Sequence, residues 1–217
     1  EILFSELRLR LDLPEEKASL LAPLGVKQLV LIPFHKSLAS QSAETFVKQM
    51  LIKTLKAKRI AVGENFRFGK DRQGDIFTLK KLCQESGIEI DIIPIYKDKV
   101  GRISSSRIRL ALSEGDLQLA KNLMGRPYKF RGKVVPGKGL GKKLGWPTAN
   151  LNIDGRKFLP SLGVYAALAF INDSKEPIAS IMNLGPQPTI DPKSPSAVEV
   201  HLLNQSIELE NSVLTIQ

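Results

Sequence analysis

Apolar and polar positions follow two different patterns along this chain, and the change falls near residue 126. Before it, apolar runs of strand length alternate with segments whose apolar residues recur at helical spacing. We expect strands at residues 28–34, 59–63 and 88–96, and helices at residues 14–24, 42–57, 76–86 and 116–124. Strands that alternate with helices favour parallel pairing, so this half predicts a Rossmann-like, doubly wound α/β domain.

Beyond residue 128 the helical spacing is lost, the apolar runs are short, and glycine and proline become frequent. We expect strands at residues 128–136, 163–171, 177–183 and 197–203. Short strands with frequent turns are typical of a small all-β antiparallel barrel. We therefore divide the chain into an α/β domain at residues 1–126 and a barrel domain at residues 127–217.

Single residues support several of these elements. Pro14 suits the first turn of its helix and Gly25 suits a helix end. Ser42 has the side chain of an N-cap. Cys83 falls on the apolar side of its helix, so we interpret it as a core residue rather than a nucleophile.

Composition narrows the class of protein. The 217 residues are 42% hydrophobic and 25% charged, which is ordinary for a soluble globular protein. No apolar run approaches the roughly 20 residues that span a bilayer, and no secretory leader opens the chain. With a single cysteine and hence no internal disulfide, we expect a cytoplasmic location and no membrane. The net charge of +10 suits binding of either nucleic acid or nucleotide polyphosphates.

Residues 132–151, GKVVPGKGLGKKLGWPTANL, combine glycines with positive charge. Gly137, Gly139 and Gly141 let the backbone approach a ligand closely. The neighbouring lysines are Lys138, Lys142 and Lys143. This combination is typical of a phosphate-binding loop, although a surface turn with solvated lysines has the same composition.

The same stretch ends in Pro147-Thr148-Ala149-Asn150. In an extended segment Thr148 and Asn150 point to one face. A hydroxyl and an amide oxygen are hard donors, and Mg²⁺ takes oxygen ligands together with substrate phosphates. We therefore expect a nucleotide phosphate and Mg²⁺ at this segment.

A second candidate anion site precedes a helix that continues through residue 112. The segment reads Ile103-Ser104-Ser105-Ser106-Arg107-Ile108-Arg109. Hydroxyls at a helix start leave backbone N–H groups aimed outward, where the helix dipole favours an anion. The two arginines add forked donors suited to phosphate. A serine N-cap with two solvated arginines explains the segment equally well.

Taken in order, these blocks resemble the bacterial bifunctional riboflavin kinase/FMN adenylyltransferases, also called FAD synthetases. The resemblance covers nearly the whole chain. It rests on VGENFRFGKDRQGD (62–75), ISSSRIR (103–109), MGRPY (124–128), the stretch at 132–151, LPSLGVYAA (159–167), MNLGPQPT (182–189) and VEVHLL (198–203). It implies an enzyme that converts riboflavin to FMN and FMN to FAD, with ATP as co-substrate and Mg²⁺ as cofactor.

For the kinase reaction, the resemblance implies that Glu199 is the general base that takes the proton of the ribityl hydroxyl. Thr148 and Asn150 would then bind Mg²⁺ and phosphate, and Asn183 would lie near the flavin. The ATP phosphates would be held by Gly137, Lys138, Gly139, Gly141 and Lys142. From the residues alone, Glu199 could instead be a solvated glutamate on an edge strand.

For the adenylyltransferase reaction, the resemblance assigns the ATP phosphates to Ser104, Ser105, Ser106, Arg107 and Arg109. Asn65 and Phe66, in the GENFRFG loop, would lie on the flavin side.

The chain also departs from the family. The stretch Gly-x-Phe-Asp-Gly-x-His-x-Gly-His is absent, since His35 and His201 lie in other contexts and are interpreted as loop and strand residues. The family's last segment and helix, which close over the flavin, are absent as well. We therefore expect a fragment with weak kinase activity and no adenylylation of FMN, which an assay showing FAD formation would contradict.

Two other classes of protein stay open. A basic OB-like nucleic-acid-binding protein fits the charge and the barrel, although such barrels usually display stacking aromatics. A non-catalytic flavin-binding remnant is the other. Riboflavin fluorescence with and without Mg-ATP separates them. As partners we expect riboflavin, FMN and ATP, with neither nucleic acid nor membrane, and a chain that is a monomer or a weak oligomer.

Overall fold

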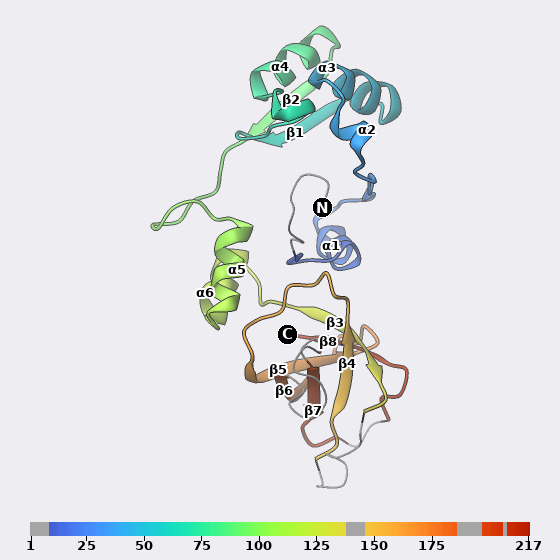
Figure 1. The fold of residues 1–217 in the computed structure, drawn as a ribbon, viewed down its shortest axis with the longest axis vertical. Coiled ribbons are helices and arrows are strands. Elements are labelled where there is room, and N and C mark those ends of the chain that lie inside the picture. Colours follow the sequence, from blue (N-terminus) through green and yellow to red (C-terminus); the bar gives the residue numbers. More distant parts are fainter. Residues whose placement is uncertain (1–8, 138–145, 186–196, 206–207) are drawn as a thin grey trace. The chain divides into compact units, whose positions relative to one another are not determined.

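The computed structural model describes residues 9–137, 146–185, 197–205 and 208–217 (Figure 1). The described residues form two compact units, each with its own core. The first unit comprises Val30–Ile103, and the second comprises residues 9–29 together with the described part of Ser104–Gln217. The predicted domain boundary at residue 126 is a separate matter from these compact units, and it stays a prediction.

The first unit is built on two parallel strands, β1 (Arg59–Gly63) and β2 (Glu89–Ile93), as the sequence predicted. Helix α4 (Ile76–Glu85) connects them and contributes the buried Leu79 and Cys83 to the core. Asp75 caps α4, because its Oδ1 accepts hydrogen bonds from the Thr78 N–H and hydroxyl at 2.8 and 2.9 Å.

The predicted strand at residues 28–34 was wrong. The structure has no strand there, and Leu31 and Phe34 are 63% and 48% exposed. An apolar run can have the composition of a strand, but a strand forms only where a neighbour accepts its backbone hydrogen bonds. Within the described part of the first unit, the sheet consists of β1 and β2 alone.

The predicted helix at residues 42–57 is present with a different backbone. After the short α2 (Lys36–Ala39), which the sequence did not predict, Ser42 caps α3 (Ala43–Thr45) with its Oγ 3.0 Å from the Thr45 nitrogen. The chain then continues as a π-helix, η2 (Phe46–Thr54), in which Val47 is fully buried.

Four short helices belong to the second unit. They are α1 (Pro14–Leu21), η1 (Ala22–Leu24), α5 (Ser105–Ser113) and α6 (Leu117–Met124). Pro14 opens α1, and Gly25 follows η1 in the left-handed region at φ 84°, as expected. The Ser161 N–H donates to the Leu112 carbonyl at 2.9 Å, which ties the end of α5 to the segment that precedes β5.

The rest of the second unit is a closed antiparallel barrel in the order β3-β4-β7-β6-β5-β8. The sequence predicted β3 (Phe130–Val135), β5 (Gly163–Ile171), β6 (Ile178–Gly185) and β7 (Ala197–Leu202), with shifts at the ends. It missed β4 (Ala149–Ile153) and β8 (Val213–Ile216). Figure 1 shows β8 lying beside β3, where it closes the barrel around a core that includes Leu184, Val198 and Leu214.

A buried ion pair fastens α1 and the segment before it to the connection between β4 and β5. The side chain of Lys157 is fully buried, and its Nζ donates to Glu16 Oε2 at 2.7 Å and to the carbonyls of Leu11 and Lys129 at 2.5 and 2.7 Å. The Tyr128 hydroxyl adds a bond to the Leu11 carbonyl at 3.1 Å. Burial lowers the pKa of Lys157, and the carboxylate of Glu16 opposes that shift.

Candidate functional site

Three candidate residues lie side by side in one row across the outer face of the barrel. Glu199 on β7 pairs directly with Asn150 on β4, and on its other side with Asn183 on β6. Their sequence neighbours on these strands, such as Val198 and Leu184, point into the core. Side chains directly opposite each other on neighbouring strands come within contact distance. The register thus brings one carboxylate and two amides together.

Thr148 adjoins this row. It directly precedes β4 and is exposed, and strand alternation gives it the same side as Asn150. Gly137 lies against Asn150, because a Cβ at Gly137 would collide with the Asn150 amide nitrogen. A larger residue at position 137 would therefore have to displace the Asn150 amide, whether or not the Gly137 backbone contacts a phosphate.

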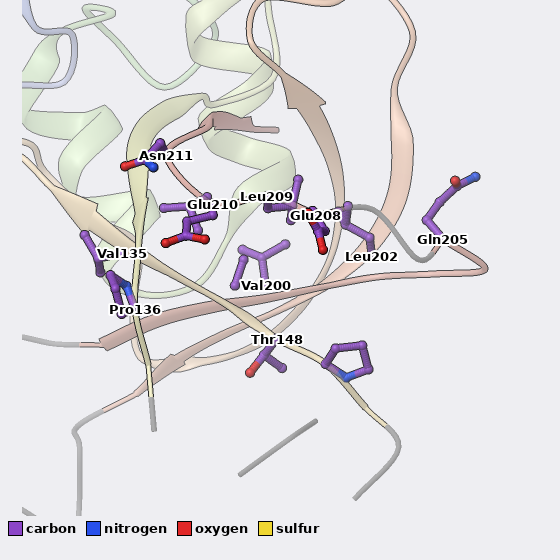
Figure 2. A pocket seen from close by; sticks show the side chains of 13 residues that line it. Val135, Pro136, Thr148, Val200, Leu202, Gln205, Glu208, Leu209, Glu210 and Asn211 are labelled. Atoms are coloured by element: carbon purple, nitrogen blue, oxygen red, sulfur yellow. The ribbon is translucent and has the colours of Figure 1, made fainter. Parts of the chain in front are cut away.

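A cavity of about 610 Å³ opens beside Thr148. Its apolar walls include Val134, Val200, Leu202 and Leu209, and Glu208 and Glu210 lie among its polar residues. In Figure 2 the side chains of Val135 and Pro136, Thr148, and Glu208 to Asn211 surround Val200. An apolar pocket with a few polar groups at its edge is the usual form of a small-molecule site.

Part of the predicted phosphate loop lies outside the described residues, namely Lys138, Gly139, Gly141, Lys142 and Lys143. Among the residues that the structure describes, no group of three or more histidine, cysteine, aspartate or glutamate side chains could hold a metal ion. The donors in the row and at Thr148 are of another kind: a hydroxyl at Thr148, an amide oxygen at Asn150 and the carboxylate of Glu199.

The serines of the ISSSRIR segment stand at the start of α5. Ser104 caps the helix, with its Oγ 3.4 Å from the Arg107 nitrogen, while Ser105 and Ser106 are exposed in the first turn. The Arg109 Nε donates to the Leu9 carbonyl at 3.1 Å. These residues belong to the second compact unit, whereas Asn65 and Phe66 belong to the first.

Asn65 and Phe66 follow β1 in the loop that the sequence singled out. With the Asn65 amide oriented so that its oxygen faces Arg102, that oxygen accepts from the Arg102 guanidinium at 3.0 and 3.2 Å. The Phe66 ring stacks on Phe68 with centroids 5.4 Å apart and packs against the core of the first unit. Phe66 therefore helps to hold this loop against the core of the first unit.

Sequence reasoning missed several residues around the row. His201 lies two positions after Glu199 and contacts Trp146 and Pro147. Alternation along VEVHLL could have placed His201 on the face of Glu199. The cavity residues Glu208 to Asn211 carried no local signal, because the segment before β8 has no regular spacing.

Two family models match the chain, and they divide it between them. The FAD synthetase model matches residues 2–107, and the riboflavin kinase model matches residues 124–217. The two domains belong to the FAD synthetase and riboflavin kinase families. The predicted fold class is confirmed, with a nucleotidyltransferase-type domain followed by an antiparallel six-stranded barrel.

Curated relatives are named for both activities. The chain is 36% identical over 200 residues to the bifunctional riboflavin kinase/FMN adenylyltransferase of Escherichia coli (strain K12), covering 92% of this chain and 63% of that protein. The protein of the same name from Haemophilus influenzae is 33% identical over 202 residues, covering 93% of this chain and 65% of the relative. The chain thus spans less than two thirds of these relatives.

A solved structure is also similar. It is titled a macrolide-efflux protein from Streptococcus pneumoniae, and it matches with a TM-score of 0.83 and 31% identity over 96% of this chain and 66% of that one. In the described part of the present chain, none of the helices is long and apolar enough to cross a membrane.

The row and the cavity both lie in the riboflavin kinase-family domain, whose model includes Thr148, Asn150, Asn183 and Glu199. The FAD synthetase-family match includes Asn65, Phe66 and the residues from Ser104 to Arg107, but stops before Arg109.

Proposed function

We propose that the riboflavin kinase-family domain transfers the γ-phosphoryl group of ATP to the 5′-hydroxyl of riboflavin. The observation that carries this proposal is the row of Asn150, Glu199 and Asn183, with Thr148 beside it. Phosphoryl transfer depends on positioning and charge neutralisation, with one group to orient the nucleophile. Glu199 is the only carboxylate within the row, and so it is the group proposed for that task.

In this proposal Glu199 accepts the proton of the ribityl hydroxyl as its oxygen bonds to the γ-phosphorus and the bond to the β-phosphate bridge breaks. The products are FMN and ADP. The Thr148 hydroxyl and the Asn150 amide oxygen fit Mg²⁺, which prefers oxygen donors and substrate phosphates. When bound, Mg²⁺ would neutralise phosphate charge.

The surroundings support a position for each substrate. The cavity beside Thr148 has apolar walls at Val134, Val200 and Leu202, suited to the nucleoside part of ATP. On the outer face, Asn183 has exposed apolar neighbours, with Val164 opposite it on β5 and Ile181 two positions before it. A flavin ring lying there would have an apolar surface beneath it and an amide at its edge.

Replacing the proposed base tests the function. Glu199→Gln should lower kcat for FMN formation by about a hundredfold or more, because general-base catalysis typically contributes that much. Binding of Mg-ADP should stay close to that of the unchanged protein. Glu176→Gln, the same change on an exposed glutamate of the β5–β6 turn, is the control. Full turnover in the Glu199 variant would remove the base from the proposal.

For the FAD synthetase-family domain we propose the binding of FMN and of the ATP phosphates that belongs to the second step of FAD biosynthesis, transfer of AMP from ATP to FMN with release of pyrophosphate, while residues 1–217 by themselves are expected not to complete that transfer. Asn65 and Phe66 are proposed for flavin binding, and Ser104, Ser105, Ser106, Arg107 and Arg109 for phosphate binding. The support is the match to the FAD synthetase family and the helix start at Ser104. The test is quenching of FMN fluorescence by the protein. If the Asn65→Ala variant quenches it as strongly as the unchanged chain, the flavin assignment is contradicted.

A further inference from the structure

His201 makes a side-chain contact just beyond the point where two barrel strands stop pairing. Its Nδ1 lies 2.8 Å from the Pro147 carbonyl oxygen, and its ring meets the edge of Trp146 with centroids 5.2 Å apart. The pairing of β4 with β7 runs from Leu151 to Ala149. The histidine therefore extends the contact between the two strands across Pro147 and Trp146.

This contact bears directly on Thr148. Ala149 pairs with Val200, and the same antiparallel register continued by one residue brings Thr148 opposite His201. The Pro147 carbonyl and the Thr148 nitrogen share one rigid peptide plane. Because a carbonyl only accepts, Nδ1 carries the hydrogen and donates it. A hydrogen bond to that oxygen fixes the plane from which the Thr148 side chain departs.

The contact lies outside the hydrophobic core. Val200 and Leu202, the neighbours of His201 on β7, point inward and are almost fully buried. Trp146 is 62% exposed, and Ile181, which pairs with His201, is 42% exposed. Removing the imidazole should therefore leave the core packing unchanged. Its effect should fall on the segment that leads into β4.

We propose that His201 is a positioning residue that holds the Trp146–Pro147–Thr148 segment, so that the Thr148 hydroxyl faces the side of Asn150 and Glu199. The proposal rests on the kinase function proposed above. It assigns to His201 no proton transfer and no contact with either substrate.

Two replacements separate the hydrogen bond from the ring. His201→Asn places an amide N–H where Nδ1 lies, whereas His201→Leu keeps similar bulk without a donor. His35→Leu makes the same chemical change at the other histidine, which caps α2 in the first unit. Each variant is assayed in the whole chain for FMN formation with Mg-ATP and riboflavin varied in turn, and for thermal unfolding.

We expect His201→Leu to lower kcat/KM for Mg-ATP roughly tenfold, because misplacing a binding group costs affinity and rate. The KM for riboflavin and the midpoint of unfolding should stay close to those of the unchanged protein. His201→Asn should recover most of the loss, and His35→Leu should have wild-type kinetics. The emission of Trp146, the only tryptophan, should change in the leucine variant more than in the asparagine variant.

Each contrary result has its own meaning. If the unchanged chain forms FMN and His201→Leu does so with the same kcat/KM, the positioning role is overturned while the kinase function stands. If His201→Asn loses as much as His201→Leu, the ring rather than its hydrogen bond matters, and the proposal is overturned. If the unchanged chain forms no FMN from riboflavin and Mg-ATP, the kinase proposal fails and this inference fails with it.

Discussion

The two compact units hold their candidate residues in different ways. In the barrel, Asn150, Glu199 and Asn183 come from three strands and meet because the antiparallel register aligns them. In the first unit, Asn65 and Phe66 follow β1 in a loop whose path depends on glycine and on packing against α3. The backbone of a site held by sheet register should stay in place when one of its side chains is replaced, whereas a site held by a loop depends on the conformation of that loop.

The largest effect is expected at the barrel row. Thr148→Val removes a hydroxyl while keeping the shape, and it should lower Mg-dependent formation of FMN by at least about a hundredfold. The fold should stay intact, as judged by thermal unfolding. Thr215→Val on β8 is the matched control, since it makes the same change at a partly exposed barrel position away from the row. Unchanged turnover in the Thr148 variant would refute its proposed role.

The next largest effect is expected on the stability of the second unit, from breaking the ion pair between Lys157 and Glu16. Lys157→Met leaves Glu16 buried without its partner and should lower the free energy of unfolding by about 3 kcal/mol. Urea unfolding followed by Trp146 emission measures it. Adding Glu16→Leu should restore part of the loss. A Lys157→Met variant as stable as the unchanged protein would show that the ion pair does not support the barrel.

A third change tests the loop of the first unit. Gly69 has φ 72°, and a Cβ there would lie 2.7 Å from the Ala43 nitrogen. Gly69→Ala should therefore cost about 2 kcal/mol or more, through both the left-handed backbone and the clash. Gly87, at φ 64° with open space around it, isolates the backbone part when replaced by alanine.

The Gly69→Ala and Gly87→Ala variants can be compared by labelling the thiol of Cys83. It is buried in the core of the first unit and is the only cysteine, so its rate of thiol labelling reports opening of that unit. Labelling should be much faster in Gly69→Ala than in Gly87→Ala. Equal rates would mean that the loop yields to the added methyl group.

The smallest effect is a dependence on pH. Hydrogen bonds from the Thr78 N–H and hydroxyl lower the pKa of Asp75. Its stabilising contribution is therefore complete above the unfolded-state value of about 3.9 and is lost as the pH falls through the lower folded-state pKa. Hydrogen exchange of the α4 amides should accelerate over that range. In Asp75→Asn, which keeps an acceptor but cannot titrate, this acceleration should be smaller.

Much of the fold could be predicted from local signals. Ser42 and Gly25 marked helix ends, and frequent turns indicated the barrel. The signals failed where a partner decides the outcome. Residues 28–34 have the composition of a buried strand but pair with none of the strands in the described part of the chain. By contrast, β4 and β8 are short and partly polar and are strands because the barrel supplies partners on both sides.

The site shows the same limit. Alternation along VEVHLL was enough to predict that the Glu199 side chain points away from those of its valine neighbours. That Asn150 and Asn183 flank it depends on register across three strands, which no single segment encodes. The hydrogen bond from His201 to Pro147 joins residues 54 positions apart in sequence, and the cavity joins β3, β4 and β7 to the segment before β8.

The place of β8 has a consequence for synthesis of the protein. β8 lies between β3 and β5, so both of those strands keep an open edge until Val213–Ile216 has been translated. Unpaired edges invite pairing with other chains. A nascent chain that pauses before β8 has emerged would therefore present a nearly complete but open sheet, and slow codons at that stage should raise aggregation of the nascent protein.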